Sequence, residues 1–239
     1  MIGLGTLVNV AAVIVGGVIG VLLHGGLKKR FQDILMQALG LATMFIGAAG
    51  VFAGMLKVTD TGLTSAGATV VIASLVLGAF LGECIDIESR IERFGEWLKK
   101  KARSSGDPKF VEAFVSSTLV VCVGAMAVVG SLEDGIQGNP STLYTKAALD
   151  FVIVLILASM QGKGTIFAFI PLGIFQGLIT LFARFIEPIL TETAVLNLSF
   201  VGSILIFSVG INLCFGKKIK VGNMLPAVLL AIICGILNL

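Results

Sequence analysis

Long apolar segments follow one another along almost the whole chain, and they limit its fold more than any other feature. Each is close to the roughly 20 residues that a helix needs to cross the hydrocarbon core of a bilayer. The segments lie at about 2–23, 33–56, 63–82, 110–132, 143–160, 165–184, 194–215 and 221–239. The sequence therefore predicts an all-α, polytopic bundle of about eight transmembrane helices, forming a single integral membrane domain over residues 1–239.

The composition excludes most other classes of protein. Charged residues make up 13% of the 239 residues, about half of the roughly 25% that is usual in soluble domains. A mean hydropathy of +1.05 is too apolar for the surface of a folded soluble protein. A soluble enzyme, a nucleic-acid-binding protein and a disordered chain are all excluded on these grounds, and the lipid bilayer is the predicted partner.

The lysines and arginines divide unevenly between alternate connections. With eight helices, 14 of the 17 fall on one side of the membrane, and only Lys57, Lys146 and Arg184 fall on the other. Basic residues are enriched on the cytoplasmic side, so both termini are predicted to lie outside. The start of the chain lacks the basic region of a cleaved signal peptide, and the first apolar segment is expected to remain as a helix.

The longest connection, 83–109, has the pattern of an amphipathic helix. Ile87, Ile91, Phe94 and Leu98 recur at helical spacing, and basic residues gather at its end. One apolar stripe, mixed charges and a basic end are typical of a helix that lies in the membrane interface. We predict a cytoplasmic interfacial linker, with a regulatory or partner-binding helix as the alternative.

Three Gly-rich apolar stretches, 45–56, 122–132 and 200–210, resemble one another. With eight helices the first two run outward and the third runs inward. Oppositely oriented copies are typical of the inverted repeats of secondary transporters. Shared composition alone is the alternative explanation.

The cysteines and the single histidine show no pattern of a metal or redox site. Cys84, Cys122, Cys214 and Cys234 lie within or at the edges of apolar segments, without CxxC or Cys/His spacing. His24 is the only histidine, and the sequence offers no Ser/His, Cys/His or HExxH arrangement. We therefore predict no metal, no cofactor and no enzyme activity.

Residues 81–150 carry a resemblance to a known family. The matching stretches are 81–90, 93–98, 110–115, 122–127, 130–135 and 141–150. They resemble the amphipathic linker and central signature of the bacterial YqgA/YdfK-like membrane proteins, domain of unknown function 554. The resemblance implies a multi-pass protein of the bacterial inner membrane for which transport has been suggested, without a substrate. It supplies no catalytic or binding residues.

Asp150 is the most prominent charged residue within an apolar segment. A helix that begins near Ser141 or Thr142 places Asp150 about 12 Å along its axis, with Lys146 one turn earlier on the same face. Charges at membrane depth cost at least a few kcal/mol. Asp150 is either a proton- or cation-binding carboxylate with Lys146 as its internal counter-ion, or part of a structural salt bridge with Lys146 directed outward.

Two further acids, Glu133 and Asp134, follow the fourth segment in a Gly-rich sequence. Gly130, Gly135 and Gly138 favour an irregular backbone with exposed carbonyls, which would suit a cation site. An external loop with solvated charges is the alternative.

Three amides lie within apolar segments: Asn9, Gln176 and Asn212. Each is a candidate to bind substrate, with interhelical hydrogen bonding as the alternative. Pro171 and Gly173 precede Gln176, so a kink is expected there.

Together these features predict a small-solute or ion transporter that is coupled to protons or sodium and works by alternating access. Its pathway residues would be Asp150, Glu133, Asp134, Lys146, Asn9, Gln176 and Asn212. A channel and a non-transporting scaffold or regulatory subunit are the alternatives. A homo-oligomer is also predicted.

Overall fold

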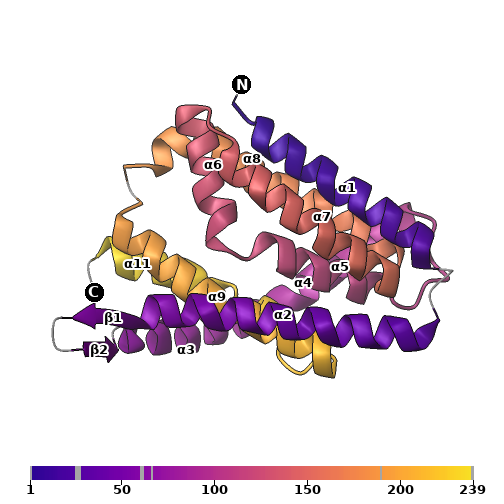
Figure 1. Ribbon diagram of the computed structural model, residues 1–239, viewed down its shortest axis with the longest axis horizontal. Helices are drawn as coiled ribbons and strands as arrows, with labels where there is room; N and C mark the ends of the chain where they lie inside the picture. The colour runs from indigo at the N-terminus through magenta and orange to yellow at the C-terminus, as the bar shows by residue number, and fades with distance from the viewer. Residues whose placement is uncertain (1, 25–27, 60–61, 66, 189, 238–239) are drawn as a thin grey trace. The chain divides into compact units, whose positions relative to one another are not determined.

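The computed structural model describes residues 2–24, 28–59, 62–65, 67–188 and 190–237, and most of them are helical (Figure 1). The chain forms two compact units. The first unit comprises Met1–Leu39, Ser89–Cys122 and Met126–Ile186, and the second comprises Gly40–Glu88, Val123–Ala125 and Glu187–Leu239.

In the first unit, α1 lies along α7 (Figure 1). The helices of this unit are α1 (Leu4–His24), the start of α2 (Lys29–Met55), most of α4 (Ile87–Lys101), α5 (Phe110–Cys122), α6 (Ala125–Gln137), α7 (Ser141–Gln161), the 3-10 helix η1 (Lys163–Ala168) and α8 (Phe169–Ile186). A Cβ atom at Gly20 would lie 2.7 Å from the Cβ of Ala158. Small residues therefore let the two backbones approach closely.

In the second unit, α3 packs against α10 and α11, and α11 packs against α9. The elements of this unit are the remainder of α2, β1 (Leu56–Thr59), β2 (Gly62–Ser65), α3 (Ala68–Ile85), α9 (Glu192–Phe215), α10 (Val221–Met224) and α11 (Pro226–Ile236). Its apolar core contains Val71, Phe200, Val201, Ala227 and Ala231.

The predicted helical membrane fold is confirmed, and each of the eight predicted segments contains helix. Among the described residues, six helices are long and apolar enough to cross a membrane. They are α1, α2, α3, α7, α9 and the run Lys163–Ile186 that joins η1 to α8. The other two predicted segments, 110–132 and 221–239, differ from the expected single spans.

The fourth segment is broken. Its two halves, α5 and α6, are bent by 59° relative to each other, and the break contains Gly124, whose φ is +156°. Few residues other than glycine adopt such a φ, which explains why the helix stops here. The pair counts as a seventh span if both halves belong to one crossing.

The eighth segment is shorter than predicted. Its helical run covers Val221–Ile236, with a turn at Leu225 between α10 and α11. Pro226 begins α11, where the missing N–H of proline costs no helical hydrogen bond.

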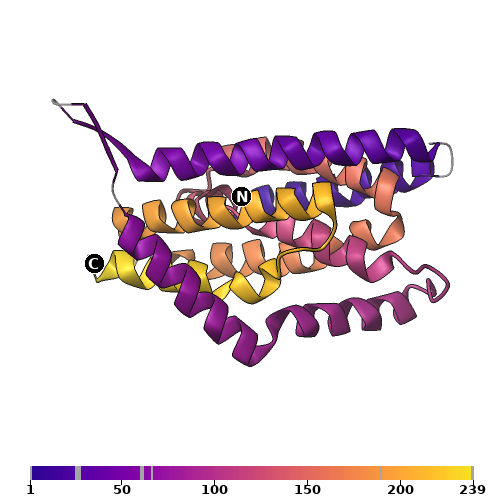
Figure 2. The same cartoon turned by 90° about the horizontal axis from the view of Figure 1, so that it is seen from below.

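A β-hairpin occupies part of the third predicted segment, so α3 begins at Ala68 instead of residue 63. Strands β1 and β2 pair antiparallel, with Leu56 opposite Ser65, and join the end of α2 to the start of α3 (Figures 1 and 2). Gly62 has a φ of +129°, which favours glycine in a tight connection.

The linker 83–109 contains the predicted amphipathic helix as α4. Leu98 is buried, whereas Trp97 is half exposed and stacks on Phe94, with ring centroids 5.7 Å apart. The last turn carries Lys99, Lys100 and Lys101. The amphipathic character is thus confirmed, and the position of α4 in the membrane interface stays a prediction.

Candidate functional site

A polar cluster lies inside the first unit where α1 meets α7 and α8. The side-chain amide of Asn9 donates a hydrogen bond to Asp150 Oδ2 at 3.0 Å and another to Gln176 Oε1 at 3.4 Å. Asn9 and Gln176 are fully buried, and Asp150 is 4% exposed. The structure thus brings three predicted pathway residues from three separate helices into contact.

Lys146 completes this cluster from within α7. Its ammonium forms an ion pair with Asp150 and donates a hydrogen bond to the carbonyl oxygen of Val121 at 2.9 Å. Val121 belongs to the last turn of α5, whose carbonyls lack helical donors because the helix is broken after Cys122. The salt bridge is therefore present in the form of the first alternative, with Lys146 as an internal counter-ion, because its side chain is buried between a carboxylate and a helix end instead of being directed outward.

A second polar level lies about one turn nearer the start of α1. The hydroxyl oxygens of Thr6 and Thr180 are 3.4 Å apart, and Asp134 Oδ2 accepts a hydrogen bond from the backbone N–H of Gly5 at 3.0 Å. Gly5 is in the first turn of α1, where N–H groups have no helical acceptor and negative charge is favoured. Asp134 therefore caps α1 from α6.

An apolar layer lies on the other side of the cluster. Val13, Val154 and Leu172 are each four residues from Asn9, Asp150 or Gln176 along their own helices. With Val121 and Ala168 they form a fully buried apolar cluster. The polar groups thus extend from the start of α1 to Asp150 and end against aliphatic side chains. We call the polar set Asp134, Thr6, Thr180, Asn9, Gln176, Asp150 and Lys146 the α1 column.

Three atoms of the α1 column have no hydrogen-bond partner among the described residues. They are Asn9 Oδ1, Gln176 Nε2 and Asp134 Oδ1, all on fully buried residues. A buried polar atom without a partner costs about 1–3 kcal/mol. Among the described residues, the column thus retains one free donor and two free acceptors.

The region around Glu133 and Asp134 differs from the prediction. Both acids are in helix α6 and not in an irregular loop, and Gly130 and Gly135 are also helical. Of the three glycines, Gly138 alone has a left-handed φ, +65°. The solvated-loop alternative fails as well, because Asp134 is fully buried.

Glu133 makes a different contact from its neighbour Asp134. Its Oε2 accepts a hydrogen bond of 2.6 Å from the hydroxyl of Thr142 at the start of α7. This contact ties α6 to α7. The structure thus separates two acids that are adjacent in the sequence.

The expected irregularity near Gln176 lies before Pro171. Pro171 is in the first turn of α8, and the departure from α geometry is the 3-10 helix η1, Lys163–Ala168, immediately before it. The missing N–H of Pro171 therefore breaks no hydrogen bond in the body of α8.

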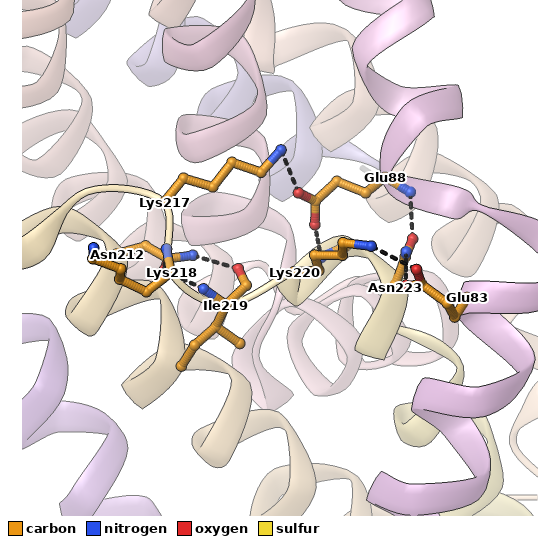
Figure 3. A network of polar contacts seen from close by, with 9 residues as sticks. Glu83, Glu88, Asn212, Lys217, Lys218, Ile219, Lys220 and Asn223 are labelled. Carbon is orange, nitrogen blue, oxygen red and sulfur yellow. Dashed lines mark hydrogen bonds and ion pairs between the residues drawn. The ribbon is translucent and has the colours of Figure 1, made fainter.

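Asn212 belongs to the second unit, where its side chain supports a loop. Its Oδ1 accepts hydrogen bonds from the backbone N–H groups of Lys218 and Ile219, both at 2.9 Å. Its Nδ2 donates to the carbonyl of Ile219 at 2.7 Å (Figure 3). These contacts account for both polar atoms of the side chain, and they favour the structural alternative for Asn212.

Sequence reasoning missed a second polar network, in the second unit. Figure 3 shows Glu83 and Glu88, near the joint of α3 and α4, facing the loop that precedes α10. Glu88 pairs with Lys217 at 2.6 Å and accepts from the N–H of Gly222 at 3.0 Å, and Glu83 pairs with Lys220 at 2.5 Å.

Asn223 closes this network, accepting from the N–H of Glu88 at 2.7 Å and donating to Glu83 at 2.6 Å. The Glu83 carboxylate raises the pKa of Lys220. Because its carboxylates are paired, the network fastens α10 and offers no free group for a ligand. In the sequence, these residues resemble ordinary charged ends of helices, so no spacing revealed the network.

Among the described residues, no group of three or more His, Cys, Asp or Glu is arranged to hold a metal ion. The α1 column instead consists of one ion pair, two amides, two hydroxyls and a separate carboxylate. Such a set can donate and accept hydrogen bonds.

The long apolar helices, with charged and amide groups buried between them, define a polytopic helical membrane protein. The family described as "Protein of unknown function (DUF554)" matches residues 4–236. The chain belongs to this family.

Two relatives match nearly the whole chain. The "Uncharacterized membrane protein YdfK" of Bacillus subtilis (strain 168) is 32% identical over 226 residues, which cover 95% of this chain and 93% of the relative. The "Uncharacterized protein YqgA" of Escherichia coli (strain K12) is 30% identical over 232 residues, covering 95% and 94%. No solved structure matches the chain.

Proposed function

We propose that this protein is a secondary transporter of the bacterial inner membrane that moves a small polar solute or ion, coupled to protons or sodium. The observation that carries the proposal is the buried Lys146–Asp150 pair at the broken end of α5. Discontinuous helices whose free carbonyls face a polar group form the binding sites of many transporters. The proposal includes no catalysed covalent step.

Energetics support a functional role for this pair. Charges at membrane depth cost at least a few kcal/mol, and replacing a buried ion pair by apolar residues is often neutral or stabilising. Stability alone therefore gives little reason to keep Lys146 and Asp150. The unpartnered atoms of Asn9 and Gln176 beside them add free hydrogen-bonding capacity.

The distribution of lysines and arginines supports an orientation. It favours both termini outside; in that orientation the Asp134 end of the α1 column would face the exterior and α4 would lie in the cytoplasmic interface. The partners in this proposal are the lipid bilayer and the small polar solute or ion, and no nucleic acid. Assembly as a homo-oligomer stays a prediction.

The direct test is electrometry on proteoliposomes adsorbed to a solid-supported membrane. Jumps in pH, in NaCl against choline chloride, and in a panel of amino acids, carboxylates and sugars are applied to wild type and to Asp150→Asn. We expect a transient current that Asp150→Asn reduces at least tenfold. Glu187→Gln, which neutralises an exposed carboxylate, is the matched control and should leave the current unchanged.

Two outcomes would contradict the proposal. Equal currents in wild type and Asp150→Asn would remove this carboxylate from the mechanism. A steady conductance that shows no coupling between solute and ion would instead indicate a channel.

A further inference from the structure

The surroundings of Asp150 leave no room for a metal cation between its usual ligands, because Lys146 takes that place. Transporter sites for sodium use carboxylates together with carbonyls freed at helix ends. Here the ammonium of Lys146 already lies between Asp150 Oδ2 and the carbonyl of Val121. Asn9 turns its donating Nδ2, not its oxygen, toward the same carboxylate. The site thus contains its own cation and directs donors at Asp150.

Further polar groups accompany Asp134 near the start of α1. Gly5 and Asn9 are four residues apart on α1, about 6 Å along its axis. The hydroxyls of Thr6 and Thr180 lie at the level of Asp134, about one turn from Asn9, and each can both donate and accept a hydrogen bond. Asn9 Oδ1 and Asp134 Oδ1 are free acceptors among the described residues. The series provides polar atoms at each level from one carboxylate to the other.

The two ends of the series differ. On one side Val13, Val154 and Leu172, each four residues from Asn9, Asp150 or Gln176, belong to a fully buried apolar cluster. At the opposite end Asp134 lies at the start of α1. The series therefore runs from Asp150 toward the start of α1.

On the basis of the proposed transport function, we infer that the coupling ion is the proton and that it moves along the α1 column between Asp134 and Asp150. On arrival, the proton forms an O–H bond with the Asp150 carboxylate, and Lys146 loses its charged partner while keeping the Val121 carbonyl. Release breaks the same O–H bond and restores the ion pair. No electron moves, and the pair changes from neutral to a charge of +1.

The neighbours of Asp150 agree with this role. The titratable groups around it among the described residues are Lys146 on its own helix and Cys122 at the end of α5. From α1 it accepts a hydrogen bond from the Asn9 amide, which also bonds to Gln176 of α8. Protonation of Asp150 therefore changes chiefly its pairing with Lys146, and that change would drive rearrangement of the helices.

Infrared difference spectroscopy on the reconstituted full-length protein tests proton binding without a known solute. Acidification should produce a protonated-carboxyl band that is lost in Asp150→Asn and unaffected by replacing choline chloride with NaCl. Electrometric pH jumps test the path. Thr180→Val, which keeps the side-chain shape, should slow the current at least fivefold. Thr142→Val removes a hydroxyl that contacts Glu133 outside the column and should leave the rate unchanged.

The outcomes separate this inference from the proposed function. A sodium-triggered current or band shift that Asp150→Asn abolishes would overturn the proton assignment and leave transport intact. Equal slowing by Thr180→Val and Thr142→Val would overturn the path. Absence of any response to pH, sodium or solute would count against both proposals.

Discussion

Removing one member of the Lys146–Asp150 pair should cost much more stability than removing both. In Asp150→Leu, Lys146 keeps only the Val121 carbonyl, 2.9 Å from its Nζ, and in Lys146→Met, Asp150 keeps only the Asn9 amide at 3.0 Å. Each single change leaves a buried charge without its counter-charge, which typically costs about 3–5 kcal/mol. The double variant replaces both charges with apolar groups and should be about as stable as wild type.

A double-mutant cycle measures this difference. The free energy of unfolding is obtained from reversible SDS titration in mixed micelles, followed by circular dichroism. If the two single effects added, the double variant would lose about 6–10 kcal/mol, so a near-neutral double variant implies a coupling of several kcal/mol. A double variant whose loss equals the sum of the single losses would refute the idea that these two charges compensate each other.

The same double variant also separates stability from function. A folded Lys146→Met/Asp150→Leu protein should give no pH-triggered current, because the carboxylate that binds the proton is absent. A wild-type current from this variant would remove the pair from the transport mechanism even if the coupling energy were as large as expected.

Three further predictions test other parts of the molecule. Gly20→Ala should lower the free energy of unfolding by about 1–3 kcal/mol because its Cβ would meet α7. Gly177→Ala, whose Cβ meets nothing within 4 Å, should not lower it, and equal losses would contradict the packing argument. Asn212→Ala should destabilise the protein by about 1–3 kcal/mol, because backbone groups of Lys218 and Ile219 lose their hydrogen-bond partner. The transport current should be unchanged, and a lost current would place Asn212 in the pathway. Glu83 raises the pKa of Lys220 above 10.5, so their contact stabilises the fold below that pH and is lost above it. The fall in melting temperature as the pH rises through this range should therefore be smaller in Lys220→Met than in wild type. An identical fall in both proteins would contradict this assignment.

Periodicity and length predicted the helices because a bilayer requires apolar runs of a fixed size. They could not predict that the fourth run is broken, since the apolar character continues through Val123 and Gly124 and only the φ of Gly124 marks the bend. Hydropathy also could not predict that the eighth run is divided into α10 and α11, because a single proline begins the second helix within an otherwise uniform apolar segment. Hydropathy measures the preference for lipid, whereas helix continuity depends on the backbone at single residues.

The candidate site was predictable in part because polar residues are rare within the apolar segments. Asn9, Lys146, Asp150 and Gln176 stand out because polar groups are costly inside apolar segments, and the structure brings these four together. Thr6 and Thr180 were missed because single hydroxyls are common in membrane helices. Their spacing of three and four residues from the amides was the available indication. Asn212 is equally rare in its segment, yet a loop uses its side chain, which only the three-dimensional contacts reveal.

Close packing explains how so short a side chain as Asn9 reaches two other helices. Gly16 and Gly20 bring α1 so near to α7 that added methyl groups would clash, and Gly5 does the same beside Leu143. At that separation the Asn9 amide bonds to α7 and α8 at once, and the Gly5 N–H is exposed to Asp134. The glycines therefore do more than permit packing. By bringing α1 close to α7, they allow the Asn9 amide to donate its hydrogen bond to the buried Asp150 carboxylate. A larger residue at any of these glycines would widen the contact and remove the amide from Asp150. Substitutions on this face of α1 should thus impair the proposed proton site even where no polar group is altered.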